Sequence, residues 1–129
     1  MRPKRHQRKA PAVPARDEDN IQHTVCEALD LAHVLYCAVP NGGKRRRTEA
    51  AIMKGLGVKA GVPDLLILQG LPRKPDARGG ALEIKTRTGR VSTQQRAWRA
   101  LLREAGWEAE IGRGLDECLA VLRGWGVIG

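Results

Sequence analysis

Apolar residues recur along this chain with two periods, one typical of helices and the other of strands. In residues 17–32 they recur at steps of three and four, which predicts an amphipathic helix. Its stripe is made of Ile21, Val25, Leu29 and Ala32. Residues 34–39 form an apolar run that predicts a strand. Residues 48–56 predict a further, short helix.

In the second half of the chain, the boundaries between predicted elements are clearer. Residues 64–68 are almost entirely apolar, as in a strand buried on both faces. Residues 69–80 are rich in Pro, Gly and charge and predict an exposed turn, and residues 81–85 predict the next strand. Residues 107–111 predict a fourth strand and residues 115–125 a final helix.

The helix predicted for residues 92–105 has the best-marked ends. Ser92 and Gln95 fit a capping box, and Gly106 follows as a stop signal. We expect its apolar stripe to face the core; the stripe is made of Trp98, Leu101, Leu102 and Ala105.

The predicted order is therefore α-β-(α)-β-β-α-β-α. Strands that alternate with helices predict an α/β domain, a mixed sheet with helices against its faces. A chain of 129 residues suits one such domain. We assign it to residues 17–129.

Charge is distributed unevenly. Lys and Arg number 23 against 14 Asp and Glu, a net charge of +9 that favours polyanionic partners. Residues 1–16 carry cations and prolines but no acid, which predicts a disordered basic arm. The arm could bind nucleic acid or merely add solubility. A second group of cations, Lys44, Arg45, Arg46 and Arg47, follows Asn41 and two glycines.

Two features favour the cytoplasm. The chain has no apolar run long enough to span a membrane, and no secretory signal follows its basic N-terminus. Its three cysteines are far apart and form no Cys-x-x-Cys pair, which fits a reducing compartment.

Candidate chemistry lies on two of the predicted strands. Asp64 opens one of them, and Glu83 and Lys85 lie on the next with Ile84 between them. Because side chains alternate along a strand, Glu83 and Lys85 share a face. If the strands pair, the two carboxylates and the lysine converge. Such a set can hold a hard divalent cation for phosphodiester hydrolysis.

The order of these motifs resembles that of the VRR-NUC (virus-type replication-repair nuclease) domain, a branch of the PD-(D/E)xK nucleases. The resemblance covers about residues 17–122. It rests on five motifs in order: Glu18-x-x-Ile21-Gln22, Asn41-Gly42-Gly43, Gly61-Val62-Pro63-Asp64, Glu83-Ile84-Lys85 and Ser92-x-x-Gln95. It implies a restriction-endonuclease-like core.

The resemblance also implies residue roles. Asp64 and Glu83 would ligate Mg²⁺ or Mn²⁺, with the carbonyl of Ile84 as a further ligand. Lys85 would orient or activate the attacking water. Glu18 would complete the acidic cluster, and Gln95 corresponds to a glutamine of the family. DNA contacts would come from Gln22, Asn41 and the cations of residues 44–47.

Several of these residues have structural alternatives. Glu18 could simply complement the dipole of its helix. Gln95 could serve the capping box, and we expect it to do only one of the two jobs at a time. Trp98 could stack on DNA bases, but its place on an apolar stripe favours the core.

The resemblance implies a metal-dependent DNA endonuclease that acts on branched DNA such as four-way junctions or flaps. Bare domains of this kind are typically phage or prophage proteins and homodimers. Two alternatives remain: a non-catalytic nucleic-acid-binding protein on the same fold, and a sequence-specific restriction-type endonuclease.

Overall fold

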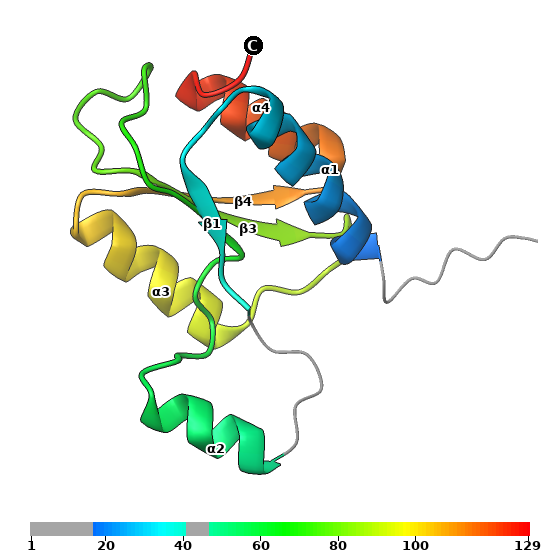
Figure 1. The fold of residues 1–129 in the computed structure, drawn as a ribbon, viewed down its shortest axis with the longest axis vertical. Helices are drawn as coiled ribbons and strands as arrows, with labels where there is room; N and C mark the ends of the chain where they lie inside the picture. The colour runs from blue at the N-terminus through cyan, green and yellow to red at the C-terminus, as the bar shows by residue number, and fades with distance from the viewer. Residues whose placement is uncertain (1–16, 41–46) are drawn as a thin grey trace, which may run out of the picture.

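A computed structural model describes residues 17–40 and 47–129 of the chain (Figure 1). The basic arm and residues 41–46 lie outside the described part. The elements follow the predicted order: α1 (Asp17–Leu31), β1 (Tyr36–Ala38), α2 (Arg47–Gly55), β2 (Leu65–Ile67), β3 (Gly80–Lys85), α3 (Thr93–Glu104), β4 (Glu108–Arg113) and α4 (Leu115–Trp125).

The strands form one four-stranded mixed sheet in the order β1-β2-β3-β4. The first three strands pair antiparallel, with Leu65 opposite Leu82. β3 and β4 run parallel and are joined through α3, with Lys85 aligned with Arg113. A parallel pair needs such a crossover connection, because a tight turn can join only antiparallel strands.

Most of the hydrophobic core lies on one face of the sheet. α1 and α4 pack together there (Figure 1), and their apolar residues meet the alternate side chains of β2 and β3. The fully buried members are Val25, Leu29, Leu65, Ile67, Leu82, Ile84, Cys118 and Leu122. Alternation along β3 therefore turns Glu83 and Lys85 towards the opposite face.

α3 lies against that opposite face, and here the predicted burial is wrong. No residue of α3 is fully buried, and Leu101 is 55% exposed. Polar contacts instead hold this helix to β4: Arg99 and Arg103 both donate to the carbonyl of Ala109 and pair with Glu110. Because β4 is an edge strand, the sheet covers the apolar stripe only in part, and Trp98 is half-buried.

Residues 69–80 also depart from the predicted exposed turn. The segment is largely exposed, but Leu71 is buried in the core, and Gly79 and Gly80, the latter already in β3, are buried as well. The Arg73 amide donates to the carbonyl of Trp125, which fastens this loop to the end of α4. β2 is less buried than expected, because Leu66 is only half-buried and Leu68 is 42% exposed.

No helix in residues 17–40 and 47–129 is long and apolar enough to cross a membrane.

Candidate active site

Strand pairing brings Asp64, Glu83 and Lys85 together at the end of β3. Continuing the Leu65–Leu82 register by one residue puts Asp64 opposite Glu83. The amide of Ile84 donates to Asp64 Oδ2 over 2.7 Å, which fixes this carboxylate against β3. Lys85 Nζ lies 3.8 Å from Glu83 Oε2, on the same face of the strand.

These polar groups are unusually buried. Glu83 is 5% exposed and Lys85 is 8% exposed. Glu83 Oε1 is buried and accepts no hydrogen bond from any group in the described part of the chain. A buried carboxylate oxygen without a donor is costly unless a proton or a cation satisfies it.

The pKa values of Asp64 and Glu83 also indicate a site that needs a proton or a cation. Burial, and then the negative charge of Asp64, raise the pKa of Glu83 to about 8. Burial also raises the pKa of Asp64, although the Ile84 amide opposes that shift. Without a cation the pair therefore retains a proton at neutral pH.

Glu18 joins the site at longer range. It stands in the first turn of α1, and its charge raises the pKa of both Asp64 and Glu83. Within the described residues, however, no three Asp, Glu, His or Cys side chains gather closely enough to hold a metal. The carboxylate donors at the site are thus Asp64 and Glu83. Hard cations such as Mg²⁺ usually keep several waters, so two carboxylates and a backbone oxygen fit one.

Gln95 makes a cap contact and a contact to the acidic pair at the same time, which we expected to exclude each other. Its Oε1 accepts the Ser92 amide over 2.8 Å, which completes the capping box of α3. Its Nε2 donates to Glu83 Oε2 over 2.9 Å. The prediction was wrong because an amide side chain has separate donor and acceptor ends, and here they face different partners.

The loop between β3 and α3 closes over the site beside α1. At Gly89, a Cβ atom would lie 3.2 to 3.4 Å from Thr86 Oγ1, Lys85 Cδ and Glu18 Oε2. The Arg113 guanidinium donates to the carbonyl of Gly89 and fixes the loop from the end of β4. Sequence reasoning missed this loop, although the close spacing of Lys85, Arg87 and Arg90 was a visible signal.

The expected DNA-contact residues are placed only in part. Gln22 is half-buried on α1, one turn after Glu18. Arg47 begins α2. Asn41, Lys44, Arg45 and Arg46 lie outside the described residues.

A mixed sheet flanked by helices, with a buried acidic pair and a lysine at one strand end, defines a nuclease-like α/β domain. The family model of the VRR-NUC domain matches residues 16–116. The chain belongs to the VRR-NUC family.

Solved structures agree with this assignment. One described as a VRR-NUC domain protein is 25% identical, with a TM-score of 0.62, and the match covers 88% of this chain and 90% of that one. A second, described as a VRR-NUC domain, is 15% identical with a TM-score of 0.57, covering 83% and 95%. The second likeness concerns the fold alone. No curated protein matches the chain in sequence.

Proposed function

We propose that this protein is a Mg²⁺- or Mn²⁺-dependent endonuclease that hydrolyses phosphodiester bonds of DNA. One observation carries the proposal: Glu83 Oε1 is buried without a hydrogen-bond donor in the described residues, while Asp64 and Lys85 lie beside the same carboxylate. Most buried side-chain oxygens in native proteins have a hydrogen-bond partner, so an unsatisfied one in this position favours a bound cation. A divalent cation would satisfy it and remove the need for the retained proton.

The proposed roles follow from the donors present. Asp64, Glu83 and the Ile84 carbonyl would hold the cation, which would neutralise phosphate charge and acidify a bound water. Lys85 would orient that water and stabilise charge that develops on the phosphate. Gln95 would keep Glu83 in its ligating orientation, because it already bonds Oε2 and leaves Oε1 free.

We further propose that the substrate is branched DNA and that the active form is a homodimer. This extension rests on the family resemblance and on one geometric argument. One site per chain cuts one strand at a time, so symmetric cleavage of a four-way junction needs two sites. A closed twofold dimer would supply them.

The test uses matched substrates and metals. Purified protein is incubated with a labelled linear duplex, a flap and a four-way junction that share arm sequences, in EDTA, Mg²⁺, Mn²⁺ or Ca²⁺. We expect junction cleavage in Mg²⁺ and Mn²⁺, none in EDTA and little in Ca²⁺, because Ca²⁺ takes a larger and looser coordination sphere. Glu83→Gln, which keeps the side-chain shape, is the matched inactive control.

Each rival gives a distinct result. Cleavage that persists in EDTA contradicts the metal mechanism. DNA binding without cleavage in any metal supports the non-catalytic alternative, and discrete sites on plasmid DNA support a restriction-type enzyme. For the homodimer, light scattering of a monomer together with unpaired nicks around the junction contradicts the proposal.

A further inference from the structure

A broad, strongly basic hollow of about 940 Å³ opens beside the candidate active site. It lies between the β3–α3 loop, the first turns of α3 and the end of β4. Four arginines line it: Arg87, Arg90, Arg96 and Arg113. Among the described residues, no acidic side chain lines it. A second hollow, by contrast, mixes Arg73 and Lys74 with Asp76 and Glu108.

The guanidinium groups in the hollow are largely without partners. Arg113 donates to the Gly89 carbonyl, a neutral acceptor. Within the described residues, the side chains of Arg87, Arg90 and Arg96 make no hydrogen bond or ion pair. On the same helix as Arg96, Arg99 and Arg103 both form ion pairs with Glu110. The arginines without a partner in the described residues therefore lie around the hollow, Arg96 on α3 and Arg87 and Arg90 on the β3–α3 loop.

Several like charges around one concavity repel one another and attract an anion. Guanidinium groups present forked donors that match phosphate oxygens, so arginine is well suited to phosphate recognition. Because the hollow is open and wide, it suits a chain of phosphates better than an enclosed small ligand. Hydroxyl groups of Thr88 and Thr93 at its rim add neutral donors.

The hollow adjoins the residues of the active site. Arg87 follows Lys85 by two positions, and Arg113 is aligned with Lys85 across the parallel strands. Gly89 lines the hollow, and a Cβ atom added there would lie within 3.4 Å of the Lys85 and Glu18 side chains. Arg87 and Thr88 continue into a further hollow beside Asn20 of α1. A strand whose phosphate reaches Glu83 would thus lay its neighbouring phosphates along this loop.

We propose that the hollow lined by Arg87, Arg90, Arg96 and Arg113 is the binding site for the DNA phosphates that flank the cleaved one. The proposal rests on the proposed nuclease function and deepens it. These contacts position the strand without reading its sequence, since they touch only the backbone. The predicted contacts of residues 44–47 and of the basic arm would be additional to this site.

The test measures DNA binding apart from cleavage. The variant Arg90→Gln/Arg96→Gln removes two exposed cations that hold no described partner, so its fold should be unaffected. Fluorescence anisotropy gives the Kd for a labelled duplex and a four-way junction over a series of salt concentrations, with EDTA present. We expect weaker binding and a salt slope reduced by about two, since each phosphate contact contributes about 0.9.

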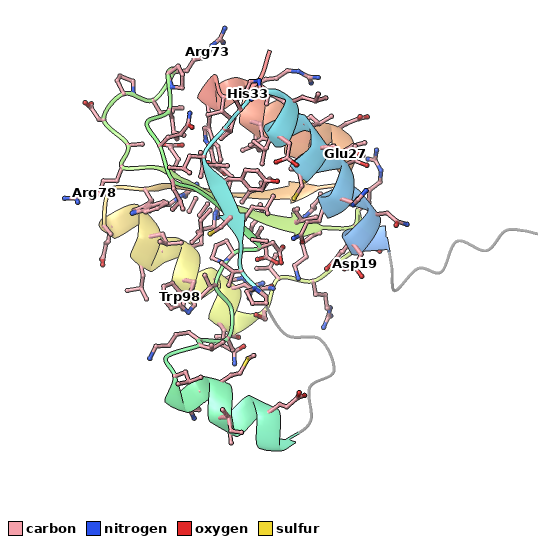
Figure 2. All side chains as sticks on the ribbon, viewed as in Figure 1. Asp19, Glu27, His33, Arg73, Arg78 and Trp98 are labelled. Carbon is pink, nitrogen blue, oxygen red and sulfur yellow. The ribbon has the colours of Figure 1, made fainter. Side chains whose placement is uncertain are left out.

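The matched control is Arg73→Gln/Lys74→Gln, which removes two exposed cations from the mixed hollow near Trp125. Figure 2 shows Arg73 on the loop that leads into β3, whereas Asp19 marks the start of α1 near the other end of that strand. The control should keep the wild-type slope. An equal fall in both double variants, or no fall in the first, overturns the proposal.

The outcome is separable from that of the proposed function. If wild type cuts no DNA in any metal but the Arg90/Arg96 variant alone loses salt slope, the phosphate site stands and the nuclease proposal fails. If wild type cuts DNA and the slope does not change, the nuclease proposal stands and the hollow is not the phosphate site.

Discussion

β3 is buried along its whole length, but its first half is apolar, whereas its second half adds two charged side chains to the core residue Ile84. Gly80, Ala81 and Leu82 belong to the packed interior, and a Cβ at Gly80 would come within 2.5 Å of the Trp125 ring. Glu83 and Lys85, on either side of the core residue Ile84, are buried polar groups, and within the described residues one Glu83 oxygen has no donor. One short strand therefore supplies core residues along its length and a charged site towards its end.

Burial of the apolar residues and burial of the charged residues of β3 have opposite effects on stability. Burying Leu82 lowers the free energy of the fold, because apolar surface leaves water. Burying Glu83 as an anion raises it, because the carboxylate loses hydration that Gln95 and Lys85 replace only in part. We therefore expect substitutions of the apolar residues, such as Leu82, to reduce stability and substitutions of Glu83 or Lys85 to reduce activity.

The largest expected effect is on cleavage. Lys85→Ala and Glu83→Ala should each abolish it, by at least about a hundredfold, since each removes a group that acts on the phosphate or its metal. Circular dichroism and DNA binding should remain close to those of wild type. A folded variant with full cleavage activity would sink the catalytic assignment and, with it, the contrast between the two halves.

A matched substitution one residue earlier should act the other way. Leu82→Ala removes a fully buried side chain and leaves a cavity, so the free energy of unfolding should fall by about 2–5 kcal/mol. Chemical denaturation measures this loss. Any protein that remains folded should bind the metal and cut DNA normally. Unchanged stability would show that this half of the strand does not carry the core.

The pH dependence sharpens the comparison further. Burial and the charge of Asp64 raise the pKa of Glu83 from its ordinary value of 4.5 to about 8, so the native state holds a proton that the unfolded chain loses. Between these values the native state binds more protons, and stability must fall as pH rises. The melting temperature of metal-free protein should therefore be lower at pH 8 than at pH 6.

Two additions make this prediction specific. Glu83→Gln should flatten the pH dependence, because the substituted side chain does not titrate. Mn²⁺ should raise the melting temperature more at pH 8 than at pH 6, because metal and proton compete for the same carboxylates. A metal-free protein equally stable at both pH values would contradict the burial of an unsatisfied carboxylate.

The smallest expected effect separates the two roles of Gln95. Ser92→Ala removes only the cap and should cost about 1 kcal/mol of stability, with cleavage retained. Gln95→Ala removes part of the same cap and also the bond to Glu83. It should cost similar stability and in addition slow cleavage. Equal cleavage rates in the two variants would assign Gln95 to the cap alone.

Local sequence patterns determined much of this protein. Hydrophobic periodicity gave the order of elements and the bounds of α4, and the capping box located the start of α3. Alternation along a strand was enough to set Glu83 and Lys85 on one face. These features depend on residues a few positions apart, for which backbone geometry fixes the side-chain directions.

Only the tertiary structure decided how distant residues meet. The register of β2 against β3 sets Asp64 beside Glu83. The crossover through α3 brings the side-chain Nε2 of Gln95 to the Glu83 carboxylate. Arg96 and Arg113 have no pattern in common along the chain, yet they line one hollow. The partial exposure of Leu101 follows from the width of the sheet, which no helical period encodes. Strand pairing and packing act between residues far apart in sequence. The contact of Gln95 with Glu83 and the arginine-lined hollow beside the site are therefore visible only in the folded chain.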